Sequence, residues 1–246
     1  GIGDPGKQHP GRSVVLDLDG KLRCEGPEGT LFSWFRAESV WSLDLRARLD
    51  LGTCTSSPGL DLKGNEGPLF FLSEGNAAYL SPEGNAMSRF DLATSKVTNT
   101  SQRHEDFISS AVLYGGDVVV LAGGELVRMD SATLKVKSSQ RLLECAYTPS
   151  LIEQGDALYL LDDCEGVLYR LSDSLSLDEG WQLPLDEGSD IEISAVGTDD
   201  GIWLVDVEQS GEPYFFNARR ERFEQIPAEL KNAAPIYALV FDLDPN

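Results

Sequence analysis

The sequence predicts an all-β protein, a β-propeller of four-stranded antiparallel blades, and two observations carry this prediction. The first is a clear meander. Apolar runs at Ile108–Tyr114 and Val118–Leu121 are joined by a Gly-Gly-Asp turn, and strands over Leu126–Asp130 and Leu134–Ser138 follow. Runs of Val and Leu bounded by Gly, Asp and Ser are typical of antiparallel hairpins. Since one such sheet cannot bury both of its faces alone, we expect neighbouring sheets.

The second observation is a repeat in which an apolar residue followed by a small polar or acidic one ends each third strand. The copies are Leu43-Asp44, Phe90-Asp91, Met129-Asp130, Leu171-Ser172 and Phe216-Asn217, at spacings of 47, 39, 42 and 45 residues. An apolar second strand lies about ten residues before each copy, at Leu31–Phe35, Ala77–Leu80, Val118–Leu121, Leu158–Leu161 and Ile202–Val205. Four-stranded units every ~40–45 residues are the spacing of propeller blades. We therefore expect five blades, or six if the two terminal segments form a blade of their own.

The two ends of the chain predict how the ring closes. Residues 1–12 are rich in Gly and Pro, which predicts a flexible leader, and residues 13–246 then form a single propeller domain. Strands are expected at Ser13–Leu18 and Ile236–Leu243. Strands from both termini in one sheet would close the ring without leaving a long free edge.

Two units carry a family resemblance. Asp156–Leu177, with Gly-Val-Leu-Tyr-Arg-Leu-Ser-Asp-Ser-Leu, and Glu125–Val136, with Leu-Val-Arg-Met-Asp-Ser-Ala-Thr-Leu, resemble the repeats of PQQ-type and YVTN-type propellers. The resemblance covers residues 66–228 and implies the propeller fold. The chain lacks the regular Trp and Gly docking pattern of quinoprotein repeats, so the resemblance does not imply a quinone cofactor. We expect no cofactor, with Ca²⁺ as the one ion that converging carboxylates could hold.

The charge balance restricts the partners. The chain has 20 Lys and Arg against 41 Asp and Glu, a formal net charge of −21. Such a surface repels phosphate backbones and anionic lipid surfaces, so we expect no nucleic-acid partner. No apolar run approaches the ~20 residues of a membrane-spanning helix, so we expect no membrane insertion. We therefore expect the partner to be a protein or a carbohydrate.

The four cysteines predict two disulfides. If Gln154-Gly155 forms a hairpin loop, opposed residues have numbers that sum to 309, and Cys145 and Cys164 meet this condition. Directly opposed Cβ atoms lie ~4.5–5.5 Å apart, which a disulfide can nearly bridge. Cys24 and Cys54 are then the remaining pair. Four buried free thiols are the alternative; disulfides would place the protein outside the cytoplasm, as a secreted, periplasmic or surface-tethered chain.

Candidate functional residues are few. The inner strands are expected to begin near four acids, Glu66, Asp106, Glu144 and Asp190, which could converge at one mouth of the central channel. His104 is expected to be a solvated loop residue, and the chain shows neither a Gly-x-Ser-x-Gly elbow nor a His-rich metal motif, so no catalytic residue or metal ligand is assigned. Trp181 is expected to pack on an outer strand, with sugar stacking as the alternative.

The sequence therefore favours a non-catalytic binding or scaffolding propeller outside the cytoplasm, with an acidic surface for a protein or carbohydrate partner. Two alternatives stay open. Channel-mouth carboxylates could serve a glycosidase-like, carbohydrate-active enzyme, which needs two of them at a defined separation. A multivalent lectin would need the same shallow pocket in several blades.

The disulfide prediction has a direct test. We expect no reactive thiol when the unreduced protein is unfolded and titrated with a thiol reagent, because all four cysteines are paired. Titration of the reduced, unfolded protein is the control and should detect every cysteine. Four thiols in the unreduced sample would contradict the prediction.

Overall fold

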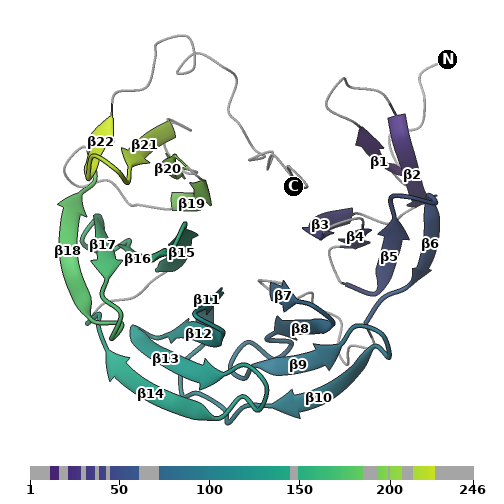
Figure 1. Cartoon of the computed structure of the whole chain (residues 1–246), viewed down its shortest axis with the longest axis horizontal. Helices are drawn as coiled ribbons and strands as arrows, with labels where there is room; N and C mark the ends of the chain where they lie inside the picture. The colour runs from purple at the N-terminus through teal and green to yellow at the C-terminus, as the bar shows by residue number, and fades with distance from the viewer. Residues whose placement is uncertain are drawn as a thin grey trace, which may run out of the picture. The chain divides into compact units, whose positions relative to one another are not determined.

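Five four-stranded antiparallel sheets hold all but two of the strands in the computed structural model (Figure 1). The structure describes residues 12–16, 22–28, 32–36, 39–42, 45–60, 72–144, 149–184, 193–198, 200–206 and 213–224. The chain divides into two compact units: unit 1 holds residues 1–82, 88–98 and 243–246, and unit 2 holds residues 83–87 and 99–242. The predicted all-β class with four-stranded antiparallel sheets is confirmed.

Unit 1 begins with a two-stranded ribbon, β1 (Arg12–Leu16) and β2 (Leu22–Glu28). Its first four-stranded sheet is β3 (Phe32–Arg36), β4 (Ser39–Ser42), β5 (Ala47–Asp50) and β6 (Thr55–Pro58). The next is β7 (Leu72–Glu74), β8 (Ala77–Leu80), β9 (Ser88–Asp91) and β10 (Lys96–Thr100), whose last residues belong to unit 2. The two sheets share one apolar cluster, which comprises Trp41, Leu45, Leu60, Ala78, Leu80 and Phe90.

Unit 2 contains three further sheets in chain order. They are β11 (Ile108–Tyr114), β12 (Asp117–Ala122), β13 (Glu125–Asp130) and β14 (Val136–Arg141); β15 (Ser150–Gln154), β16 (Ala157–Asp162), β17 (Val167–Leu171) and β18 (Leu177–Gln182); and β19 (Ile193–Thr198), β20 (Gly201–Asp206), β21 (Pro213–Asn217) and β22 (Arg222–Glu224). The first strands of successive sheets lie beside one another, β11 beside β15 and β15 beside β19 (Figure 1). Gly197 allows this approach, since a Cβ there would lie 1.8 Å from the carbonyl oxygen of Glu153.

Hydrogen bonds tie each sheet of unit 2 to the next. The Tyr114 hydroxyl donates to the carbonyl of Asp156 at 2.9 Å, and the Gln154 amide donates to the carbonyl of Thr198 at 3.1 Å. Both donors stand just before the first hairpin turn of their sheet, and both acceptors lie at the same turn of the following sheet. The successive sheets of unit 2 therefore present equivalent turns at the same end.

The turn between the third and fourth strands repeats a local motif that the sequence reading missed. Asp50, Asp91 and Asp130 each accept hydrogen bonds from the backbone and hydroxyl groups of the threonine three residues later, at 2.7–2.9 Å. These bonds lower the pKa of all three carboxyls. The residue after each threonine has a positive φ, although none is glycine: Cys54 (54°), Ser95 (58°) and Leu134 (56°).

The sequence prediction is wrong in the first unit and at one hairpin turn. The predicted second strand Leu31–Phe35 is the first strand of its sheet, β3, and the second strand is β4. The first third-strand copy is Leu49-Asp50 rather than Leu43-Asp44, because Leu49 is the buried residue before the end of β5 and Asp50, its last residue, forms the Asp-Thr turn. The first spacing becomes 41 residues instead of 47. The hairpin of β15 and β16 turns at Gly155-Asp156, one residue later than predicted, so opposed residues sum to 311. Gly155 has the positive φ (58°) that a type II′ turn places at its first central position.

Other predictions fall outside what the structure describes. The proposed leader, residues 1–12, lies outside the described residues except for Arg12 in β1. The closing strand Ile236–Leu243 also lies outside them, so blade number, ring closure and the single domain over residues 13–246 stay predictions. Within the described segments, no helix is long and apolar enough to cross a membrane.

Asp117 carries a local ion network at the start of β12. Its side chain is 6 % exposed and accepts a hydrogen bond from Arg128 Nε at 2.6 Å and another from Lys137 Nζ. Burial by itself raises the pKa of Asp117, but the hydrogen bonds from Lys137 and Arg128 outweigh it and leave the pKa below its usual value. The sequence reading placed Asp117 in the turn; the turn is Gly115-Gly116 alone.

The positive φ at Ser95 predicts a stabilising substitution. Ser95→Gly should raise the free energy of unfolding by about 0.5–1 kcal/mol, because a side chain is penalised in the left-handed region and glycine is not. Ser138→Gly is the matched control, since Ser138 is an exposed residue within β14, where glycine should cost about 0.5–1 kcal/mol. Urea denaturation measures both. Equal signs for the two variants would contradict the assignment of strain to residue 95.

Candidate functional site

The candidate site is the loop end of unit 2, where the connections leaving the fourth strands β10, β14 and β18 pair with turns between second and third strands. Ile108 N donates to Gly84 O at 2.7 Å, Leu142 N to Gly124 O at 2.9 Å, and Leu183 N to Gly166 O at 2.8 Å. These bonds fix the connections against the turns. Side chains on this end therefore project from backbone that is already hydrogen-bonded.

The structure describes two of the four acids that were predicted to form a site. Asp106, in the connection between β10 and β11, and Glu144, after β14, are both exposed at the loop end. Glu66 and Asp190 lie outside the described residues. Their joint role as a channel-mouth site therefore stays a prediction.

The turn Gly123-Gly124 brings two of these connections together. A Cβ on Gly123 would lie 2.0 Å from the Asp106 carboxylate, and one on Gly124 would lie 2.5 Å from the carbonyl oxygen of Leu143, the neighbour of Glu144. Both glycines also have positive φ, 54° and 81°. Asp106 and Glu144 thus belong to segments that pack on either side of one glycine turn.

Negative charge dominates the loop end. The acids described there are Glu83, Glu105, Asp106, Glu125, Glu144, Asp162, Asp163 and Glu165, whereas the basic side chains described there are Arg103, His104 and Arg141. Arg103 pairs with Glu83, and Arg141 donates to the carbonyl of Gly123 at 3.2 Å. The local balance is therefore acidic.

His104 is half-buried rather than solvated. Its backbone N–H donates to Asn85 O at 2.8 Å, and its Nε2 is buried without a hydrogen-bond partner among the described residues. Burial lowers the pKa of His104, and the charge of Glu125 opposes this only in part. The imidazole is therefore held in its neutral form more strongly than a solvated histidine.

The turn after β16 holds two buried acids. Asp162 is 4 % exposed and Asp163 is 6 % exposed, and Asp162 Oδ1 accepts hydrogen bonds from the backbone N–H groups of Cys164 (3.0 Å) and Glu165 (3.2 Å). Burial raises the pKa of Asp162 despite these bonds. With Cys164 these acids form a group of metal-ligand type, but Cys164 is disulfide-bonded and cannot bind a metal as a thiolate.

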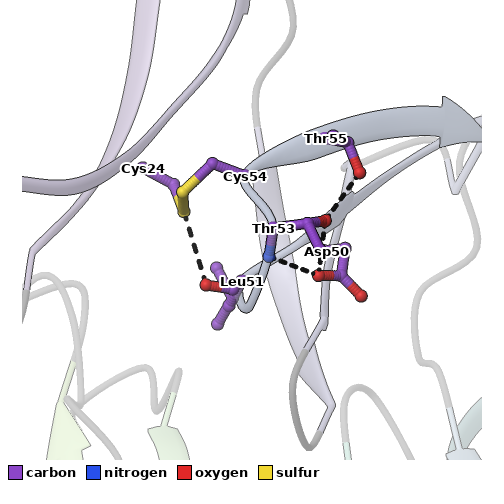
Figure 2. The surroundings of a disulfide bond; sticks show 6 residues. All are labelled: Cys24, Asp50, Leu51, Thr53, Cys54 and Thr55. Atoms are coloured by element: carbon purple, nitrogen blue, oxygen red, sulfur yellow. Dashed lines mark hydrogen bonds between the residues drawn. A yellow bond between two sulfur atoms is a disulfide. The ribbon is translucent and has the colours of Figure 1, made fainter.

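Unit 1 contains the predicted Cys24–Cys54 disulfide, with Cα atoms 5.3 Å apart. Figure 2 shows Cys54 at the end of the Asp50–Thr53 turn, with Cys24 Sγ 3.7 Å from the carbonyl oxygen of Leu51. A disulfide sulfur carries no proton, so this is a packing contact. The Cys24–Cys54 disulfide links β2 to the hairpin of β5 and β6. Of the other predicted pair, Cys164 is disulfide-bonded, and Cys145 lies outside the described residues.

Trp181 packs between two sheets. Its ring centroid lies 4.8 Å from that of Phe216 and 6.3 Å from that of Tyr159. All three belong to the cluster that joins the β15–β18 and β19–β22 sheets. This supports the packing interpretation of Trp181 rather than sugar stacking.

Comparison with solved structures decides the fold. Over 89 % of this chain and 78 % of the other, the structure matches virginiamycin B lyase from Staphylococcus aureus with a TM-score of 0.69 at 13 % identity. A streptogramin B lyase matches with a TM-score of 0.62 at 10 % identity, over 79 % of this chain and 67 % of the other. Both lyases are β-propellers. The fold is a β-propeller.

A third match is a computationally designed protein, Ika8, with a TM-score of 0.60 at 12 % identity over 84 % of this chain and 65 % of the other. No protein-family model matches the chain, and no curated protein matches it in sequence. At these identities the matches establish the propeller fold alone. The lyase activity belongs to the matched proteins.

Sequence reading identified the loop-end glycines as turn residues but missed the contacts that they make with neighbouring segments. Gly84, Gly123 and Gly124 all have positive φ and all touch a neighbouring segment. The available signal was the recurrence of glycine between the second and third strands of successive units. It identifies a tight turn but does not show which side chain packs on it.

His104 predicts a pH dependence of stability. Because its pKa is lower in the folded state, His104 binds a proton more readily in the unfolded chain. Its contribution to the free energy of unfolding is therefore fully present above about pH 6.5, the unfolded-state pKa, and is lost as pH drops through the folded-state pKa. His104→Gln should flatten this part of the profile. Urea denaturation between about pH 7.5 and pH 5 measures it, and an unchanged profile in the variant would contradict the buried neutral imidazole.

Proposed function

We propose that this propeller is a non-catalytic binding module outside the cytoplasm, which presents the acidic loop end of unit 2 to a cationic surface of a partner protein. The observation that carries the proposal is the concentration of acids on hydrogen-bonded turns at this end. Carboxylates on a rigid surface attract a basic partner without an ordering cost at each contact. The Cys24–Cys54 disulfide agrees with an oxidising compartment.

A binding role suits these carboxylates better than a glycosidase role. Retaining and inverting glycosidases need two carboxyl groups that face each other about 5–9.5 Å apart, one of them with a raised pKa. Asp106 and Glu144 are exposed on segments that flank a turn, and the buried Asp162 uses one oxygen to hold its own turn. Exposed carboxylates of this kind supply electrostatic attraction for a cation rather than the facing pair that acid catalysis needs.

The test compares two variants with the same change in net charge. One carries Glu105→Gln, Asp106→Asn, Glu144→Gln and Glu165→Gln at the loop end. The control carries Asp156→Asn, Asp173→Asn, Asp178→Asn and Glu179→Gln, all exposed positions elsewhere in unit 2. The probe is a capped Lys-Gly repeat peptide, and calorimetry at low and physiological salt gives its affinity.

We expect the loop-end variant to bind the peptide about tenfold more weakly than the wild type, and the control variant to lose much less. Equal losses would show that only net charge matters and would contradict the proposed site. Selective binding on an array of neutral glycans would instead support the lectin alternative. Hydrolysis of a glycoside that is lost in the loop-end variant would support the enzyme.

A further inference from the structure

Phe107 is an exposed aromatic side chain at the acidic loop end. It is 54 % exposed, and the other large hydrophobic residues exposed in the described part of the chain are aliphatic: Val97, Val136 and Leu177. Those three lie on the outer strands β10, β14 and β18, whereas Phe107 lies in the connection that enters β11. An isolated exposed side chain needs no explanation, so its support and surroundings decide what it can do.

The Phe107 ring packs against the turn at Gly84, which we call the Gly84 seat. A Cβ on Gly84 would lie 1.9 Å from Cε2 of the ring, so the ring rests directly on the backbone of Gly84, which has a positive φ of 80°. Three backbone hydrogen bonds hold this seat: Ser101 N to Met87 O, His104 N to Asn85 O, and Ile108 N to Gly84 O, at 2.7–2.8 Å. One part of the ring is thus supported while about half of the side chain faces solvent.

The charged residues next to Phe107 in the sequence are mostly negative. Glu105 and Asp106 precede it directly, both are exposed, and neither forms an ion pair with a described residue. Glu83 precedes the glycine seat and pairs with Arg103. An exposed aromatic side chain whose sequence neighbours are carboxylates has negative potential from both the π-system and the acids, which suits a cation.

We propose that Phe107, with Glu105 and Asp106, binds an arginine side chain of the partner protein, with the guanidinium over the exposed ring face and its N–H groups toward the carboxylates. This inference rests on the proposed function and names the residue class that the acidic loop end recognises. Arginine fits better than lysine, because a planar guanidinium stacks on a ring and donates to carboxylates at the same time. A sugar could also stack on the ring, but a neutral ligand would not use the surrounding charge.

The test uses Phe107→Leu and Phe107→Trp with capped Arg-Gly and Lys-Gly repeat peptides of equal length, measured by calorimetry. Leucine keeps an apolar side chain on the Gly84 seat but removes the aromatic face, and tryptophan enlarges that face. Leu177→Ala is the control for loss of an exposed apolar side chain on an outer strand. Thermal unfolding of each variant checks that the fold is intact.

We expect the wild type to bind the arginine peptide more tightly than the lysine peptide, Phe107→Leu to lose about two- to fivefold in affinity for the arginine peptide, and Phe107→Trp to equal or exceed the wild type. Leu177→Ala should bind as the wild type does. If Phe107→Leu binds unchanged while the loop-end charge variant is weakened, the inference is overturned and the proposed function stands. If the wild type binds neither peptide at low salt, the inference and the proposed function are both overturned. If the wild type instead binds the neutral sugar cellotetraose and Phe107→Leu does not, the ring is assigned to a sugar ligand.

Discussion

Burial of the second strands on both faces is the constraint on which the rest of the structure depends. All six residues of β12 and all four of β8 are buried. In β16 the alternation can be followed residue by residue: Leu158 and Leu160 belong to the cluster shared with the preceding sheet, and Tyr159 and Leu161 to the cluster shared with the following one. Since successive side chains of a strand point to opposite faces, such a strand requires a sheet on each side.

This constraint also decides where function can reside. The sheet faces are buried against neighbouring sheets. Even Trp181, which lies on an outer strand, packs its ring against the core. The strands β10, β14 and β18 are largely exposed, but they carry few large apolar side chains. Turns and connections are left to carry recognition, as is usual for a scaffold whose loops are positioned by packed strands. The acidic loop end is therefore among the surfaces that the packed sheets leave free.

The repeating units were predictable because local signals agreed with one another in the middle of the chain. Gly115-Gly116 and Gly123-Gly124 mark two-residue hairpins, and β11 was placed with its observed bounds. The first unit was misplaced because Leu43-Asp44 and Leu49-Asp50 have the same composition, and only burial and the Asp50–Thr53 bonds separate them. The loop end was harder still. Sequence named Asp106 and Glu144, but the packing of Asp106 on Gly123 and of Phe107 on Gly84 is a tertiary contact without a local signature.

Two kinds of turn in this chain contain a residue with positive φ, and they accommodate it differently. The difference bears on recognition. Between third and fourth strands, Ser95 and Leu134 adopt positive φ although a side chain is penalised there, and the Asp-Thr hydrogen bonds hold the turn. At the loop end, glycine is needed for space as well as for φ, because a neighbouring side chain or carbonyl occupies the place of its Cβ. Close contact on glycine backbone leaves Asp106 and Phe107 few alternative positions. Less conformational freedom would then be lost at the interface when a partner binds them. This preorganisation, more than the number of charges, is what the proposed selection of one cationic side chain requires.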